Sequence, residues 1–470
     1  MAVALARLLP TWRFKASASP AWTVSSAVYP RIVAEDSALK VVSLFTGAGG
    51  LDVGLDQVGG FDLLACVELQ SRFCETLRVN RDAGRFGTPR TRIVEADLSK
   101  FDPYVLMDEL GLVPGELDVL VGGPPCQSFS TAGRRGTISD PRGQLIWDYL
   151  RFVEALRPRY FLMENVRGLL SAALQHRTIA ERPERGGPPL LDEEKPGSVV
   201  EAWIDDLGKI DGGAYRVDIF EVNSVNYGGP QLRERVLFIG NRESKCVDFP
   251  EPTHGPTESH PDLLPFRTLG EALDGLIEDV PVLMDFSPRK KRYLEQVPPG
   301  GNWRMLPTDV AMESMGKAFF AKGGRSGWWR RLSRDLPCPT ITTLPNHSST
   351  SMCHPDEVRV LSVGECARVQ EFPDGWVFSG SPAQQMQQVG NAVPARLGMV
   401  AGSVLKKSAS ASTTDADPLE EDLPPARRVY LRSHVRTRQW WRGGKAFTWD
   451  GPGGEATYRG AHKSSQERLF

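Results

Sequence analysis

The sequence lacks the features that mark several large classes of protein. It has no apolar run of about 18 residues, the length that a membrane-spanning helix needs. Its seven cysteines are scattered without a C-x-x-C pair, which argues against a disulfide framework or a structural zinc site and favours a reducing compartment. Its first glycine-rich turn is not G-x-G-x-x-G, which disfavours an NAD-linked oxidoreductase.

The chain also lacks the strong positive charge of many nucleic-acid-binding proteins. Its formal net charge is −2 over 470 residues, so only a local concentration of Arg and Lys could contact phosphates. The length predicts two or three domains. Composition predicts a disordered extension over 1–38, with a targeting peptide as the alternative, and a surface excursion over 177–200. It also predicts a linker over 406–426.

The segment that follows this linker, from Arg427 onward, is basic and carries interleaved tryptophans. Two interpretations remain open for it. It is either a poorly ordered tail, which we favour, or an appendage that contacts nucleic acid.

Cys126 stands in GGPPCQSFS, residues 122–130, a setting unlike a packed core. The two prolines remove backbone donors and exclude a helix interior or a central strand. The apolar run 117–121 before them predicts a buried parallel strand. Cys126 is therefore expected on a rigid turn at the carboxyl end of a strand, where open α/β sheets bind ligands. The alternative is an inert, buried thiol.

Pro125-Cys126-Gln127 resembles the catalytic motif of the DNA (cytosine-5) methyltransferases, in which this cysteine is the nucleophile. The resemblance extends over about 40–403, with the major motifs in order. It implies an α/β fold, a Rossmann-like doubly wound sheet that binds S-adenosylmethionine, with a smaller, irregular target-recognition domain. The expected units are a catalytic domain over 39–243 plus 384–405, a recognition domain over 244–383, and a linker and tail over 406–470.

The first strand, 40–44, runs into a glycine-rich turn and then a helical pattern, which predicts a ligand held at a helix N-terminus. Glu68 ends the second strand and could bond the ribose hydroxyls of an adenosine, although a solvated strand-end acid is the alternative. By resemblance, Phe45 packs on the adenine and Asp97 faces its amino group. The full set of expected cofactor contacts is Phe45, Gly47, Gly49, Glu68, Asp97, Leu98, Pro125, Leu145 and Asn391.

Methylation of cytosine carbon 5 requires nucleophilic help, because that carbon is itself a weak nucleophile. A thiolate that adds to carbon 6 activates carbon 5, a role that Cys126 could fill. Glu164, at the end of the apolar strand 160–163, is the candidate acid at the pyrimidine N3, with a helix-capping carboxylate as the alternative. By resemblance, Arg235 reaches the cytosine pocket and Arg233 supports the loop and phosphates; alone, they would suggest a surface pair.

DNA contacts are expected from two regions. The glycine-rich segment 128–143 predicts a mobile lid, with a static loop as the alternative, and the target base should be flipped into the pocket. Clustered cations and aromatics over 287–331 predict phosphate and base-edge contacts. The block 359–373 resembles the family's penultimate motif, a scaffold for recognition. The expected DNA-binding residues are Ser128, Arg134, Arg135, Arg325, Arg330, Arg331 and Thr340.

The sequence therefore predicts a DNA (cytosine-5) methyltransferase of restriction-modification type that uses S-adenosylmethionine and no metal. The expected partner is double-stranded DNA, with a cognate restriction endonuclease possible, and the expected state is a monomer in bacterial cytoplasm. Two alternatives remain open: a tRNA cytosine-5 methyltransferase on the same motifs, and a catalytically inactive DNA-binding module. An amino-methyltransferase is disfavoured, because its motif has no use for a cysteine.

Overall fold

The computed structural model describes residues 38–125, 144–257, 260–321, 325–411 and 424–431. Three short strands near the C-terminus are described by their backbone alone, β13 (Gln439–Arg442), β14 (Lys445–Thr448) and β15 (Arg468–Leu469). In this part of the chain, no helix is both long and apolar enough to cross a membrane.

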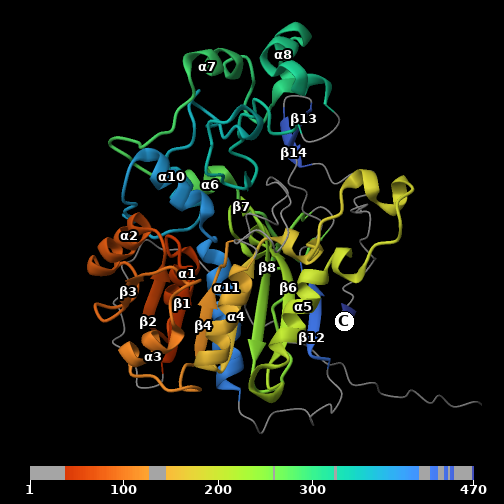
Figure 1. The fold of residues 1–470 in the computed structure, drawn as a ribbon. Helices are drawn as coiled ribbons and strands as arrows, with labels where there is room; N and C mark the ends of the chain where they lie inside the picture. Colours follow the sequence, from red (N-terminus) through yellow and green to blue (C-terminus); the bar gives the residue numbers. More distant parts are fainter. Residues whose placement is uncertain are drawn as a thin grey trace, which may run out of the picture.

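A nine-stranded sheet forms the centre of the molecule (Figure 1). The strand order is β15-β12-β6-β8-β5-β4-β1-β2-β3. Neighbours from β5 to β3 pair in parallel, whereas β8 runs antiparallel to both β5 and β6. The strands are β1 (Leu39–Leu44), β2 (Phe61–Glu68), β3 (Arg92–Glu95), β4 (Val119–Gly122), β5 (Tyr160–Asn165), β6 (Arg216–Asn223), β8 (Glu234–Asn241), β12 (Ala426–Tyr430) and β15.

Helices cover both faces of this sheet, because successive side chains of a strand point to opposite faces. Val41 packs into a core on one face, which includes residues of α1 and α11, and Val42 into a core on the other, with α3, α4 and α5. The prediction of a Rossmann-like, doubly wound sheet is confirmed. The helices of this domain are α1 (Gly50–Val58), α2 (Ser71–Asp82), α3 (Pro103–Leu110), α4 (Leu145–Leu156), α5 (Ser198–Leu207), α10 (Pro382–Asn391) and α11 (Ala395–Ser410).

Helix α11 comes from the C-terminal part of the chain and packs directly on α1. A Cβ atom at Gly54 would lie 2.2 Å from the Ala395 carbonyl oxygen, and one at Gly398 would lie 2.3 Å from that of Leu51. Only glycine allows the two backbones to approach this closely. The last long helix of the sheet domain is thus joined tightly to the first strand–helix unit.

The strand order changes direction between β1 and β4, which are direct neighbours. In open α/β sheets, such a switch point leaves a crevice at the carboxyl ends of the strands. The segments that leave β1, β2, β4 and β5 all begin at this carboxyl edge, since these strands are parallel. Sequence motifs that lie up to 120 residues apart are thus brought to one edge.

The irregular region that follows β8 has a core of its own, built around Tyr293, Leu294 and Trp329. It stands above the carboxyl edge of the sheet (Figure 1). Short elements replace the βα rhythm, as predicted: β9 (His254–Gly255), β10 (Leu264–Pro265), β11 (Cys338–Pro339), α6 (Leu269–Leu273), α7 (Pro288–Leu294), α8 (Thr308–Met315) and α9 (Val363–Val369). Strand β11 pairs with β7 (Gln231–Leu232), which precedes β8. We call residues 244–383 the recognition region.

The structure agrees with the predicted surface excursion over 177–200 but not with the whole of the predicted linker and tail over 406–470. The excursion 177–200 forms exposed 3-10 turns, Ile179–Glu181, Pro183–Arg185 and Asp192–Glu194, before α5 begins at Ser198. The prediction of a linker and tail over 406–470 is wrong at two places. Helix α11 continues to Ser410, and Ala426–Tyr430 is a strand of the main sheet because it pairs with β6.

Asp52 lies in the first turn of α1 with its side chain buried, and we predict that its charge destabilises the fold. It is 2% exposed and lies among Val41, Leu55 and Leu63. Burial raises its pKa to about 6, although Ser43 partly opposes this. Because the folded state holds this proton more tightly, the penalty appears above pH 4 and is complete above pH 6.

Asp52→Asn should therefore raise the free energy of unfolding at pH 8 by about 3 kcal/mol, because the pKa is raised from 3.8 to about 6 and one pKa unit corresponds to about 1.4 kcal/mol. Urea titrations of both proteins at pH 8 and pH 4 measure this. The gain should disappear at pH 4, and an equal gain at both pH values would contradict the explanation.

Candidate active site at the carboxyl edge of the sheet

Glu68 at the end of β2 is a fixed carboxylate beside the turn that follows β1. Its Oε2 accepts a hydrogen bond from the Gly47 N–H at 2.9 Å, and its Oε1 accepts one from the Gln70 N–H at 2.9 Å. The residue is 7% exposed. Burial raises the pKa of its carboxyl group, and the two backbone hydrogen bonds oppose that shift. Glu68 is thus held in one orientation at the switch point.

The turn that faces Glu68 leaves open space above its backbone. Phe45 and Gly47 both have positive φ, 51° and 60°, and a Cβ at Gly47 would meet no atom within 4 Å. Thr46 anchors the turn, because its N–H donates to the Val67 carbonyl at 3.2 Å. Phe45 packs against the core on the α4 side. A flat or polar ligand could approach the backbone at Gly47 within reach of Glu68.

The other expected cofactor residues lie around the same edge. Asp97 follows β3. The Asp97 Oδ1 accepts two hydrogen bonds from Ser99, one from the hydroxyl at 2.7 Å and one from the backbone N–H at 3.1 Å. These bonds, with Lys100, lower the pKa of Asp97. Leu98 is buried beside it, and Leu145 begins α4. Gly49 is the left-handed cap before α1.

Pro125 and Asn391 are the most exposed of the expected cofactor residues. Pro125 directly precedes Cys126 in the sequence. Asn391 ends α10, and its carbonyl accepts a hydrogen bond from Arg233 at 3.4 Å.

Glu164 and Arg235 form a buried ion pair between the Glu164 Oε1 and the Arg235 Nε atoms. Glu164 comes from β5 and Arg235 from β8, so the antiparallel pairing of these strands brings the two together. Glu164 is 7% exposed. A Cβ at Gly123 would lie 3.2 Å from its Oε2, so the backbone that leads toward Cys126 runs directly past this carboxylate.

Asn165 fixes the same segment from the neighbouring position. Its Nδ2 donates to the Pro124 carbonyl at 3.2 Å. Cys126 itself, with Ser128, Arg134, Arg135 and the predicted lid, lies outside the described residues.

Arg233 serves a different part of the molecule from Arg235. It is 2% exposed, and it donates to the carbonyls of Ile341 at 3.1 Å and Gly390 at 3.0 Å. Burial lowers the pKa of its guanidinium well below the usual value. Arg233 therefore joins the recognition region to the end of α10, whereas the resemblance implied a residue that supports the loop and phosphates.

The arginines expected at DNA are engaged within the recognition region. Arg330 donates to the Ser351 carbonyl at 3.1 Å, and its burial lowers the pKa to about 10. Arg331 donates to the carbonyls of Pro355 and Val297 at 3.1 and 3.3 Å, and Arg325 lies 5.0 Å from the centre of the Trp303 ring. Arg330 thus contacts its own region through Ser351, and its expected contact with DNA stays a prediction.

Thr340 also makes a structural contact. Its hydroxyl donates to the Leu232 carbonyl at 2.6 Å, next to the pairing of β11 with β7. This bond joins the recognition region to the strand that leads into Arg233 and Arg235.

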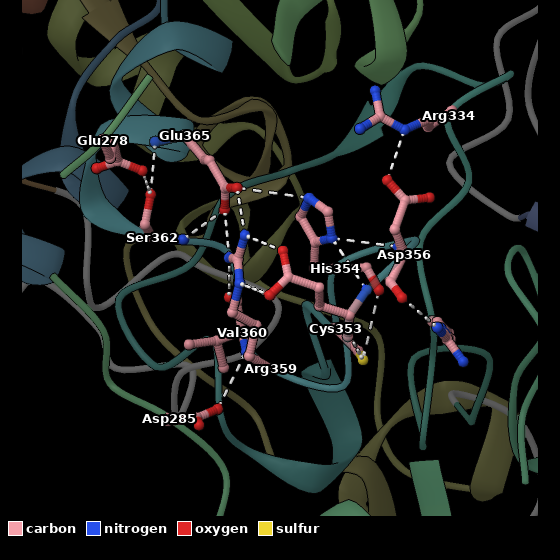
Figure 2. Close-up of polar contacts among 12 residues, drawn as sticks. Glu278, Asp285, Arg334, Cys353, His354, Asp356, Arg359, Val360, Ser362 and Glu365 are labelled. Carbon is pink, nitrogen blue, oxygen red and sulfur yellow. Dashed lines mark hydrogen bonds and ion pairs between the residues drawn. The ribbon is translucent and has the colours of Figure 1, made fainter. Parts of the chain in front are cut away.

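A buried polar network supports the block expected to act as a scaffold (Figure 2). Arg359 donates to both carboxylate oxygens of Glu365 at 2.8 Å. Glu365 in turn accepts the Ser362 N–H at 2.7 Å and caps α9. His354 Nδ1 accepts the N–H groups of Asp356 and Glu357 at 3.1 and 3.2 Å, while its Nε2 faces Glu365 at 3.4 Å. His354 and Glu365 were missed from the sequence, because neither lies in a local pattern that indicates its distant partner.

Comparisons with known proteins identify the family. The family model described as C-5 cytosine-specific DNA methylase matches residues 39–407. The chain belongs to this family. It is 35% identical over 369 residues to the type II methyltransferase M.Sau96I of Staphylococcus aureus, covering 78% of this chain and 75% of that protein. It is 36% identical to the type II methyltransferase M.Eco47II of Escherichia coli, covering 77% of each.

A solved structure agrees with the fold. The crystal structure of a protein described as a DNA modification methyltransferase encoded within an Escherichia coli prophage aligns with a TM-score of 0.52 and 23% identity. The alignment covers 80% of this chain and all of that one. The protein is thus a DNA cytosine-5 methyltransferase of the restriction-modification type, and its methyl donor is S-adenosylmethionine.

The residues at the switch point of this cytosine-5 methyltransferase fit such a donor. The open space over Gly47 lies beside the immobilised carboxylate of Glu68, as an adenosine with two ribose hydroxyls requires. The turn also stands at the N-terminal end of α1, where backbone N–H groups are available to a carboxylate.

His354 should make the methyltransferase less stable in mild acid. Burial lowers its pKa, and Glu365, Asp356, Glu357 and Arg359 surround it. Because the folded state binds this proton less tightly, the contribution of neutral His354 is complete above about pH 6.5 and is lost as the pH falls below it. Protonated Nδ1 could no longer accept the two N–H groups.

The measurement is the free energy of unfolding of wild type and His354→Asn at pH 7.5 and pH 5.5. The advantage of wild type should be smaller at the lower pH. His347→Asn, at an exposed histidine of the same region, is the control and should show no such change. A pH-independent difference for His354→Asn would contradict this interpretation.

Proposed function

We propose that the enzyme methylates carbon 5 of a cytosine rotated out of a specific duplex sequence, through a covalent adduct with Cys126. The observation that carries this proposal is the buried Glu164–Arg235 pair, which lies against the backbone that leads into Cys126. An acid and a cation in a shielded crevice suit a ring that gains negative charge in the transition state.

In this proposal, the Cys126 thiolate adds to carbon 6 of the cytosine, and the ring becomes nucleophilic at carbon 5. Glu164 donates a hydrogen bond or proton at N3, and Arg235 holds Glu164 while reaching the carbonyl side of the pocket. S-adenosylmethionine supplies the methyl group to carbon 5. A water molecule then takes the carbon 5 proton, N3 returns its proton to Glu164, and departure of the thiolate restores the aromatic ring and the free cysteine.

We assign the cofactor site to the turn after β1 and to its neighbours. Glu68 would bond the ribose hydroxyls and Phe45 would pack on the adenine. Asp97, Leu98, Pro125, Leu145 and Asn391 would complete the site. The Asp97 Oδ1 accepts hydrogen bonds from Ser99 and the Oδ2 lies 3.2 Å from Lys100 Nζ, so the adenine amino group would share the Oδ2 atom with an exposed lysine.

The recognition region would read the DNA while the segment 128–143, with Arg134 and Arg135, closes over it. Arg325, Arg331 and Thr340 would then support the reading surface. A monomer paired with an endonuclease for the same site would fit the restriction-modification type. Duplex DNA and tRNA, offered separately, test the substrate; transfer to tRNA alone would overturn the proposal.

The covalent step predicts two distinct losses. Cys126→Ser should abolish methyl transfer, with kcat down by about 1,000-fold or more, because no thiolate adds to the ring. Glu164→Gln should lower kcat by about 100-fold, because the amide cannot deliver a proton. Transfer of tritiated methyl groups to duplex DNA measures both.

A duplex that contains 5-fluorocytosine at the target should trap wild type as a covalent adduct, because fluorine cannot leave as the proton does. Mass spectrometry should locate the adduct on Cys126, and Cys126→Ser should form none. An adduct on another residue, or full activity of Cys126→Ser, would refute the mechanism.

The cofactor assignment is tested by Glu68→Gln. The amide should weaken S-adenosylmethionine binding by about tenfold or more, since a charged acceptor for two hydroxyls is lost. Isothermal titration without DNA measures the dissociation constant. Glu75→Gln, an exposed glutamate of α2, is the matched control and should bind as wild type does. Equal affinities for all three proteins would exclude Glu68 from the site.

A further inference from the structure

Strand β12 lies beyond the residues that match the family model, and yet it belongs to the catalytic sheet. It pairs in parallel with β6, from Ala426 beside Val217 to Tyr430 beside Glu221. Leu431, just past the strand, donates its N–H to the Glu221 carbonyl at 3.0 Å. Ala426 and Leu431 are 0% and 4% exposed. Residues 424–431 are therefore packed structure rather than a tail.

Two consecutive arginines of β12 bind two buried carboxylates of β6. The Arg427 Nε lies 3.0 Å from the Asp218 Oδ1, and the Arg428 Nε lies 2.9 Å from the Glu221 Oε1. Asp218 and Glu221 are 0% and 4% exposed. Positions three apart on a strand face opposite sides of the sheet, so the two pairs are separate. A buried carboxylate requires such a partner, because desolvation of its charge is costly.

Of these two ion pairs, the one between Arg428 and Glu221 is connected by further contacts to the proposed reaction centre. The second Glu221 oxygen, Oε2, lies 3.4 Å from Arg167 Nε, and Arg167 Nη1 lies 3.6 Å from Glu234 Oε2. Arg167 begins the 3-10 turn that follows β5, three residues after Glu164. Glu234 directly precedes Arg235, whose Nη1 donates to the Glu234 carbonyl at 2.8 Å.

The charges thus alternate from β12 to the buried pair: Arg428, Glu221, Arg167 and Glu234. Arg167 is shared between two carboxylates, and Glu221 is shared between two guanidiniums. If Arg428 were lost, Glu221 would depend more strongly on Arg167, which would draw Arg167 toward β6 and away from Glu234. That shift would act on the segments that carry Glu164 and Arg235.

We propose that Arg428 is a positioning residue for methyl transfer, which acts through Glu221 and Arg167 to keep Glu164 and Arg235 aligned. This inference rests on the proposed roles of Glu164 and Arg235. It assigns a function in the reaction to a strand outside the family match.

The test compares Arg428→Met with Arg427→Met in the full-length enzyme. Both variants remove one arginine from a buried pair on the same strand, so both should lose some thermal stability. Arg428→Met should lower kcat about tenfold and leave KM for S-adenosylmethionine unchanged, because small misalignments of reacting groups are costly. Arg427→Met should keep the kcat of wild type, and Arg428→Lys should recover most of the loss.

The route through Arg167 is tested by a double-mutant cycle. Arg428→Met combined with Arg167→Met should be no slower than Arg167→Met alone, because both changes break one chain of contacts. If Arg428→Met fails to fold, Glu221→Gln replaces it and should show the same loss of kcat. Two results would overturn the proposal. One is a kcat for Arg428→Met, or for Glu221→Gln in its place, that lies within about twofold of the kcat of Arg427→Met. The other is a double variant in which the two losses of kcat multiply.

Failure of the underlying function gives a different result. If wild type transferred no methyl group to duplex DNA, or Glu164→Gln kept full activity, the proposed mechanism would fail before β12 was tested. If Glu164→Gln is impaired and Arg428→Met is not, only the positioning role of Arg428 is refuted.

Discussion

The buried ion pair between Glu164 and Arg235 is the interaction on which the arrangement of this enzyme depends. A carboxylate and a guanidinium removed from water are stable only when each has the other and further hydrogen-bond partners in place. That requirement constrains β5, β8 and the backbone at Gly123 together. The segment that carries Cys126 therefore leaves the sheet directly beside an acid whose position is already determined.

Buried charges also join the parts of the molecule that short-range packing would leave separate. Arg233 connects the recognition region to α10, and Arg359 with Glu365 holds the loop after Cys353 against α9. Near one edge of the sheet, Asp218 and Glu221 hold β12. A net charge of −2 conceals this use of arginine, because many of the cations neutralise buried acids or bind carbonyls rather than facing solvent.

This internal use of arginine changes how the recognition region is understood. Its tryptophans and arginines were predicted as a DNA-contacting surface, and several of them instead build the region's own core and loops. An irregular domain with few strands has many unpaired carbonyls, and the five N–H donors of arginine satisfy them efficiently. The shape of this region thus depends on these internal contacts as much as on the residues that face outward.

The sequence by itself determined the family, the doubly wound sheet and the candidate chemistry. Those features are encoded locally: an alternating or apolar strand, a glycine-rich turn after β1, a Pro-Pro-Cys turn after β4, and acids at the ends of β2 and β5. Only the tertiary structure decided which charges are buried and with whom. Arg233, Arg330 and Arg428 look alike in the sequence, yet each meets carbonyls or carboxylates that lie many residues away. The pairing of β12 with β6 was equally hidden, because a short strand at a sheet edge is defined by its neighbour rather than by its own pattern.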